Sequence, residues 1–171
     1  PAVIRQNRKM VSVNTTLQVD LTGQCASESI GTLQLSGTGG QTETASGARQ
    51  SEGGKSIIAL HSTANVKNAD GERERVSTIV PTQPAGMAIS LMRADVDFVV
   101  TEYGVADLRN CSPCERAPKL IAIAHPDYRP MLQDYYERAV EKCADGCGHT
   151  PHILSEALSW HVRAAATGSM R

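Results

Sequence analysis

A glycine-rich turn is the segment of this sequence best suited to bind an anion. It reads SGTGG at residues 36–40 and is followed by Gln41 and a proline-free stretch to residue 50, which predicts a short helix. Glycines let backbone N–H groups approach a ligand closely, because no Cβ stands in the way. The start of a helix adds free N–H groups and a positive dipole end, which suit an oxyanion or a phosphate. A glycine pattern of this kind is more often a plain turn, so both interpretations stay open at this point.

Three further polar groups have two interpretations each. Lys55 follows two glycines and could reach a phosphate, but a solvated strand end is the favoured interpretation. The segment 102–104, Glu-Tyr-Gly, could line a cleft or form a buried polar turn at the end of a strand. His125 precedes a proline, which favours a role in shaping a turn over one as a general base.

The cysteines and one histidine offer the ligand types of a zinc site. Cys111-x2-Cys114 and Cys143-x3-Cys147-x-His149 have acceptable spacing for one. However, Cys143 completes an apolar helical face and Cys114 begins a helix, and free cysteine often behaves as a small core hydrophobe. We therefore expect reduced cysteines and no metal.

The composition indicates a compact domain without special staples. The 171 residues fit one domain, residues 1–171, which can bury roughly two-thirds of its unfolded surface. A net charge of -1 gives no electrostatic footprint for nucleic acid or an anionic membrane, and no run approaches the roughly 20 apolar residues of a membrane span. Five cysteines, an odd number, without a secretory segment indicate a reduced, cytoplasmic protein.

The elements that must position these groups follow from the apolar periodicity. Alternating patterns predict strands, and residues 65–74, with Asp70-Gly71, predict an exposed hairpin loop. Ser112 before Pro113 is a good helix cap, and the apolar positions from Met131 onward fall on one helical face. These features predict an α/β fold with a mixed sheet flanked by helices. The expected strands are MVSVN and LQVDL within residues 10–21, then residues 55–60, 76–80, 87–91 and 96–101; the expected helices are residues 41–50 and 113–124, one from Met131, with Leu132, Tyr135, Tyr136, Ala139, Val140 and Cys143 on one face, and one from Thr150.

Seven stretches together resemble the acetyl-CoA hydrolase/transferase family, in the C-terminal domain of these family I CoA-transferases. They occur in the family's order with family-like gaps over about three-quarters of the chain, and look most like 4-hydroxybutyrate and butyrate:acetate CoA-transferases. The stretches are VDLTGQ (19–24), ESIG (28–31), SGTGGQ (36–41), GGKSIIAL (53–60), STIVPT (77–82), RADVDFVVTEYGVADLR (93–109) and LIAIAHPDYR (120–129).

The resemblance implies a CoA-transferase fold and a ping-pong reaction. An acyl-CoA donates its acyl group to a glutamate, and coenzyme A attacks the resulting anhydride to give a glutamyl-CoA thioester and release the donor carboxylate. An acceptor carboxylate then takes the coenzyme A from this thioester and leaves as the new acyl-CoA. In relatives that glutamate lies farther upstream of VDLTGQ than this sequence reaches. The chain alone is therefore expected to be inactive and to need the N-terminal half of the enzyme. None of Glu28, Glu43, Glu52 and Glu102 has the matching context.

The resemblance also assigns roles to the glycine turn. It implies an oxyanion-hole amide there, with Gly37 the first choice and Gly39 or Gly40 next. Asn14 is expected beside the turn on the thioester side. The sequence departs from relatives after Gln41, where the usual Asp-Phe is replaced by Glu43-Thr44. The full set expected to bind coenzyme A is Asn14, Gly37, Gly39, Gly40, Gln41 and Lys55.

Acyl-CoA and short-chain carboxylates are the expected substrates, with no permanently bound cofactor. Relatives suggest a homo-oligomer. Two alternatives stay open: an acyl-CoA hydrolase on the same scaffold, and a non-catalytic CoA-binding or assembly module.

Overall fold

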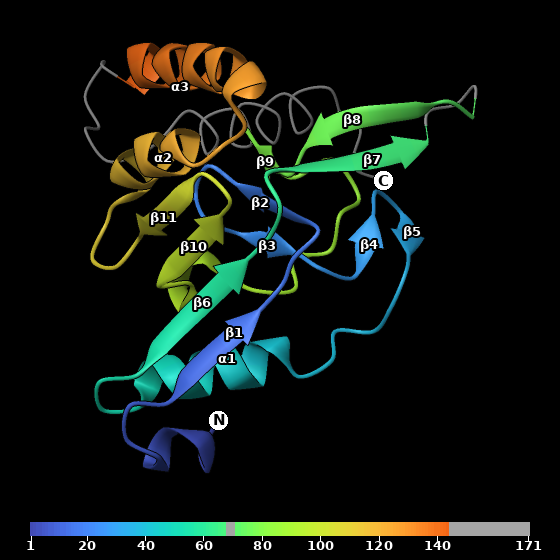
Figure 1. The fold of residues 1–171 in the computed structure, drawn as a ribbon. Helices are drawn as coiled ribbons and strands as arrows, with labels where there is room; N and C mark the ends of the chain where they lie inside the picture. Colours follow the sequence, from blue (N-terminus) through green and yellow to red (C-terminus); the bar gives the residue numbers. More distant parts are fainter. Residues whose placement is uncertain (68–70, 144–171) are drawn as a thin grey trace, which may run out of the picture.

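The structure is a computed structural model that describes residues 1–67 and 71–143. A four-stranded mixed sheet forms its centre (Figure 1). The first three strands are parallel, and the fourth returns antiparallel through a tight hairpin. The register pairs Val13 with Ile57 and Ile57 with Phe98. In sheet order the strands are β1 (Val11–Asn14), β6 (Lys55–Ala59), β10 (Phe98–Thr101) and β11 (Gly104–Asp107).

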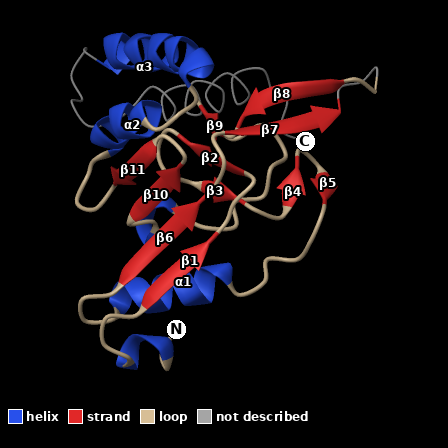
Figure 2. Cartoon of the chain, viewed as in Figure 1, coloured by secondary structure: helices blue, strands red, loops and turns tan. Residues whose placement is uncertain are grey.

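Helices cover one face of this sheet. Helix α1 (Gln41–Gln50) contacts β1 and β6, whereas α2 (Pro113–Ala122) contacts β11 and supports α3 (Arg129–Cys143). Figure 2 shows α2 and α3 together, away from α1. The buried core lies between these helices and the inner side of the strands, where Ile58 and Val99 are fully buried.

Short strands and turns surround the central sheet. A capping box between Ser112 and Glu115 begins α2, as its sequence predicts. The surrounding elements are the sheet β3 (Cys25–Ala26), β2 (Gln18–Asp20) and β9 (Ile79–Val80), the hairpins β4 (Ser29–Ile30)–β5 (Leu33–Gln34) and β7 (Thr63–Lys67)–β8 (Arg73–Ser77), and the 3-10 helices η1 (Ile4–Gln6), η2 (Arg93–Asp95) and η3 (Pro126–Tyr128).

The motif VDLTGQ is structural. The buried Asp20 carboxylate accepts hydrogen bonds from the backbone N–H and hydroxyl of Thr22, at 2.9 and 2.6 Å. It also accepts from the backbone and side-chain amides of Gln24, at 3.1 and 3.0 Å. These four bonds satisfy a carboxylate that would otherwise be costly to bury.

The α/β class, the mixed sheet and most elements are confirmed. Helix α1 spans the expected residues 41–50, and α3 buries Leu132 and Ala139 and packs Tyr135 and Tyr136 against the core. Val140 on the same helix is 41% exposed. The side chain of Cys143 and the helix expected from Thr150 lie outside the described side chains and residues.

Two strand expectations and the bounds of one hairpin loop were wrong. Residues 87–91 form no strand, because this segment makes a single bridge, from Leu91 to Cys25, and its Ala88 N–H bonds to the Ser29 hydroxyl instead. The 65–74 loop is shorter than expected, since polar β7 and β8 extend into it. The 76–80 strand breaks at Thr78, which bonds to His61 and Ser62.

Among the described residues, no helix is both long and apolar enough to span a membrane.

Candidate functional site

The glycine turn, residues 36–40, lies at the carboxyl ends of the parallel strands. It leads directly into α1, whose first residue Gln41 donates its side-chain amide to the Thr15 carbonyl at 3.1 Å. Asn14, the last residue of β1, donates its side-chain amide to the Thr44 hydroxyl at 3.3 Å. The structure thus brings Asn14, Gln41 and the turn together at the sheet edge where open α/β sheets bind ligands.

Only one glycine of the turn requires its residue type for backbone reasons. Gly39 has φ +61, in the left-handed region, whereas Gly37 and Gly40 lie outside that region. A Cβ added to any of the three would meet nothing within 4 Å. At Gly54, in contrast, an added Cβ would lie 1.9 Å from the Ala48 carbonyl oxygen. The fold therefore needs glycine at Gly54, while the space above Gly37 is open to a ligand.

Glu28 holds the turn in place. Its carboxylate accepts a hydrogen bond from the Thr38 hydroxyl at 2.9 Å, and its carbonyl accepts from the N–H groups of Leu35 and Ser36 at 2.8 and 3.2 Å. Glu28 is only 8% exposed. The motif ESIG includes Glu28 but does not by itself indicate this positioning role, which depends on a hydrogen bond to Thr38.

A hollow of about 440 Å³ lies at the same edge, and one of its lining residues, Thr15, accepts the hydrogen bond from Gln41. Glu102, at the end of β10, accepts hydrogen bonds from the Ser62 N–H and hydroxyl at 2.9 and 2.5 Å. Burial opposes ionisation of Glu102, but the bonds from Ser62 outweigh it and lower the pKa of the carboxyl group. Of segment 102–104 only Glu102 lines the hollow, and the segment forms a hairpin turn in which Glu102 and Tyr103 are exposed rather than buried. The lining residues are Thr15, Ala59, Leu60, His61, Val100, Thr101 and Glu102.

Lys55 is not part of this group. It begins β6, beside Val11, and the glycine turn lies beyond the other end of the strands. A strand of five residues rises about 3.3 Å per residue, so its two ends are roughly 13 Å apart. The structure therefore places Lys55 at the amino edge of the sheet, away from Asn14 and Gln41.

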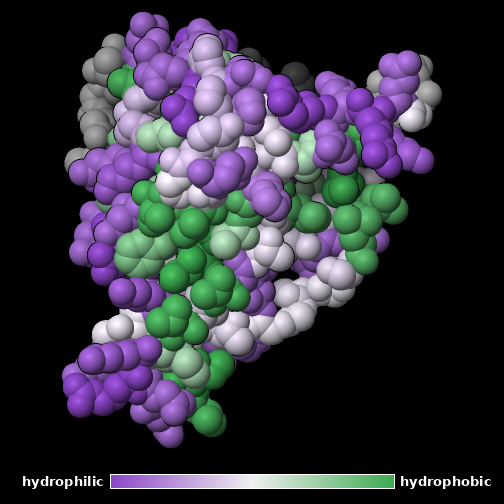
Figure 3. Space-filling model, viewed as in Figure 1, coloured by the Kyte–Doolittle hydropathy of each residue, from purple (hydrophilic) through white to green (hydrophobic). Residues whose placement is uncertain are grey.

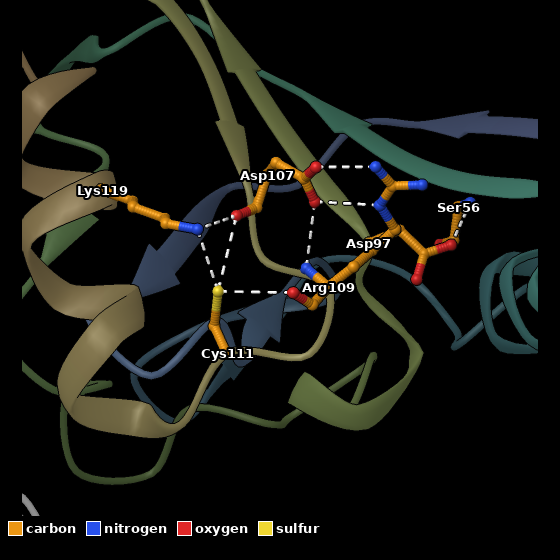
Figure 4. A network of polar contacts seen from close by, with 6 residues as sticks. All are labelled: Ser56, Asp97, Asp107, Arg109, Cys111 and Lys119. Atoms are coloured by element: carbon orange, nitrogen blue, oxygen red, sulfur yellow. Dashed lines mark hydrogen bonds and ion pairs between the residues drawn. The ribbon is translucent and has the colours of Figure 1, made fainter.

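A network of mutually satisfied charges occupies that amino edge (Figure 4). Asp107 accepts two hydrogen bonds from the Arg109 guanidinium, at 2.9 and 2.7 Å, which lower the pKa of the Asp107 carboxyl to about 2. Lys119 donates to the Asp107 carbonyl at 2.8 Å and to the Cys111 sulfur at 3.0 Å. Asp97 accepts from the Ser56 N–H at 3.0 Å. These contacts link β11, the loop after it and α2 at this edge.

Cys25, Cys111, Cys114 and His125 lie in structural positions. Over residues 1–67 and 71–143, no three His, Cys, Asp or Glu side chains are grouped so as to hold a metal ion. Cys25 is buried and Cys111 contacts an ammonium group. Cys147 and His149 lie outside the described residues, so the absence of a metal stays a prediction. His125 accepts from the Asp127 N–H and caps η3, which confirms its role in a turn.

Comparison with known proteins adds a family relationship. Residues 1–136 match the family described as acetyl-CoA hydrolase/transferase C-terminal domain. The chain is 47% identical over 138 residues to a 4-hydroxybutyrate coenzyme A transferase of Clostridium kluyveri, covering 81% of this chain and 30% of that protein. It is 32% identical over 174 residues to an acetyl-CoA hydrolase of Schizosaccharomyces pombe, covering all of this chain and 31% of that protein.

Solved structures agree. RipA from Yersinia pestis aligns with a TM-score of 0.67 and 42% identity, covering 80% of this chain and 29% of RipA. The chain thus spans only about 30% of the length of the curated relatives it matches.

Proposed function

Because the chain belongs to the acetyl-CoA hydrolase/transferase family, whose C-terminal domain it matches over residues 1–136, we propose that it is part of a CoA-transferase. In this role it helps to move coenzyme A between an acyl-CoA and a short-chain carboxylate. The observation that carries this function is the open glycine turn at the start of α1, beside Asn14.

The turn supplies electrostatic stabilisation. Each acyl-transfer step passes through a tetrahedral state in which the carbonyl oxygen becomes an oxyanion. The Gly37 N–H is our first choice for a donor to it, supported by the positive end of α1. Asn14 supplies a side-chain amide at the same edge, now bonded to the hydroxyls of Ser12 and Thr44. These donors favour the transition state over the bound substrate, because the oxyanion exists only there.

The nucleophile is assigned to another part of the enzyme. Glu28 bonds to Thr38 in the turn and Glu102 bonds to Ser62, and neither has the sequence context of the glutamate that relatives use. We assign the glutamate to the N-terminal half of the enzyme, in line with the share of the relatives that this chain spans.

Reconstitution tests this function. The chain is mixed with the upstream 70% or so of the Clostridium kluyveri relative, and acyl exchange between acetyl-CoA and butyrate is followed. We expect exchange in the mixture and none with the chain alone. Borohydride, which reduces a glutamyl thioester, should mark one glutamate of the upstream part by mass spectrometry. Exchange by the chain alone would overturn the assignment.

The similarity to an acetyl-CoA hydrolase supports a second candidate, an acyl-CoA hydrolase. Release of free coenzyme A without an acceptor carboxylate, at the same rate as with one, would favour this candidate over the transferase.

A further inference from the structure

A hollow of about 430 Å³ lies at the amino edge of the central sheet, beside the charge network of Figure 4. The end of α1, the segment before β10, the loop after β11 and the first turns of α2 all contribute to its wall. In Figure 3, hydrophilic residues gather over the loop between β11 and α2 and over the loop that leads into β6. We call it the amino-edge hollow; its charged lining residues are Arg49, Asp97, Arg109 and Arg116.

The wall of the amino-edge hollow carries more positive than negative charge. Three guanidinium groups line it, against the single carboxylate of Asp97. Asp97 is buried, accepts the Ser56 N–H at 3.0 Å and lies 3.4 Å from the Nε atom of Arg49. Arg109 is paired with Asp107, which does not line the hollow. Even with Asp107 counted, two carboxylates face three guanidinium groups.

Arg116 is the cation that has no carboxylate partner. Its half-buried guanidinium donates to the backbone carbonyls of Cys111, Thr22 and Arg93, at 3.2, 3.4 and 2.7 Å. Within residues 1–67 and 71–143 it forms no ion pair. Burial lowers the pKa of Arg116, and the positive charges of Arg93 and Arg49 act in the same direction. A bound anion would compensate this charge, which is costly to bury alone.

We propose that the amino-edge hollow binds the phosphate groups of a phosphorylated ligand, at a site separate from the glycine turn. Guanidinium groups bind phosphate oxygens through pairs of parallel N–H donors. Such donors are available here. Arg49 contacts Asp97 through Nε, and Nη2 of Arg116 makes no hydrogen bond to any residue that the structure describes. Asn110 adds a side-chain amide to the same wall.

Helix α1 separates this site from the glycine turn. The turn leads into Gln41 at the start of α1, whereas Arg49 lies in its last turn. At 1.5 Å per residue, these two positions are about 12 Å apart along the helix axis. One phosphate group cannot reach both places. The two sites also differ in their donors, because the turn offers backbone N–H groups and the amino-edge hollow offers guanidinium groups.

Titration of the chain with pyrophosphate, followed by calorimetry, tests the site. Arg49→Gln should weaken binding about tenfold and Arg116→Gln at least tenfold, because losing a hydrogen bond between charged groups typically corresponds to roughly ten- to a hundredfold in affinity. Arg138→Gln is the matched control. Arg138 is an exposed arginine that pairs with Asp134 on α3, so binding should stay unchanged in this variant.

Asp97→Asn should change the affinity in the opposite direction. It removes the one carboxylate that lines the hollow, while its side-chain oxygen can still accept the Ser56 N–H. Binding of pyrophosphate should therefore become severalfold tighter. Melting curves without ligand show whether each variant folds. Arg49 is 48% exposed, so Arg49→Gln should keep the wild-type Tm even if Arg116→Gln lowers it.

Backbone amide shifts in NMR spectra locate the bound pyrophosphate. The signals of Gly54 and Asn110, which line the hollow, should move, and those of residues 37–40 should not. Shifts confined to residues 37–40 would place the phosphate at the start of α1 and overturn the site, as would equal affinities in Arg49→Gln and Arg138→Gln. Competition by coenzyme A would assign the hollow to the substrate and overturn a separate site. The titration involves no acyl transfer, so its result is independent of the proposed function.

Discussion

Substitution of Gly37 by alanine separates a catalytic role of the glycine turn from a folding role. The φ angle of Gly37 lies outside the left-handed region, and an added Cβ would meet nothing within 4 Å. We therefore expect the free energy of unfolding to change by less than about 0.5 kcal/mol. In the reconstituted enzyme, kcat should fall by roughly a hundredfold, since a Cβ in the open space above the turn displaces the reacting carbonyl by about an ångström.

Gly39 supplies the contrasting case. Its φ of +61 should make alanine cost about 1 kcal/mol, which corresponds to roughly 2–4 °C in Tm for a domain of this size. Gly71 is the strain-matched control, because its φ is +81 and an added Cβ there also meets nothing. Gly71→Ala should lower Tm by a similar amount and leave kcat unchanged.

Both quantities are measured on the same preparations, with Tm from calorimetry and kcat and KM from acyl exchange. A Gly37→Ala enzyme with normal kcat and normal Tm would refute the oxyanion assignment at Gly37. A lowered Tm with intact kcat would make Gly37 a folding residue instead.

Three further predictions concern the described residues around the site. Arg109 lowers the pKa of the Asp107 carboxyl group to about 2, so Asp107 stabilises the fold above its unfolded pKa near 4, and this stabilisation is lost as the pH falls to about 2. Asp107→Asn should therefore lower Tm at pH 7 and flatten the Tm–pH curve between about pH 4 and 2. An unchanged slope would contradict this role. Burial raises the pKa of the Cys25 thiol to about 12, so native-state alkylation followed by peptide mass spectrometry should modify half-exposed Cys111 and Cys114 far faster, and equal rates would contradict the buried position. Thr38→Val removes the hydroxyl that bonds to Glu28, so it should lower the free energy of unfolding by about 1 kcal/mol and should also lower kcat of the reconstituted enzyme. Wild-type values of both quantities would show that this bond does not position the turn.

Local signals in the sequence predicted the elements that local interactions define. The glycines before Gln41 and after Gln50 bound α1, and the Ser112–Pro113 cap begins α2, so both helices could be located from neighbouring residues alone. Two-residue strands such as β3 and β4 are too short to show a periodicity, even though their partners β2 and β5 lie close by in the chain. The sequence therefore gave no signal for them.

The candidate site was predictable only where it coincides with a local motif. The glycine turn and Asn14 lie close to each other, because Asn14 ends β1 and the turn leads into the helix that crosses back to β6. Lys55 was included in the expected site because it follows two glycines, although a solvated strand end was the favoured interpretation. The direction of β6 confirms the strand end, at the other edge of the sheet. The role of Glu28 depends on a hydrogen bond to Thr38, ten residues away, which no spacing rule predicts.

The order of strands in the central sheet has a consequence for synthesis on the ribosome. Val11 of β1 pairs with Lys55, and Ile57 of β6 pairs with Phe98, so each strand must wait for some forty further residues before its neighbour exists. At about 5–20 residues per second, this delay lasts roughly 2–8 seconds for each pairing. The β7–β8 hairpin closes between neighbouring residues and can form within microseconds of leaving the exit tunnel. Nascent chains in which residue 77 but not residue 98 has left the tunnel should therefore carry a formed hairpin beside a sheet that lacks β10 and β11, and their exposed valines should make them substrates for chaperones.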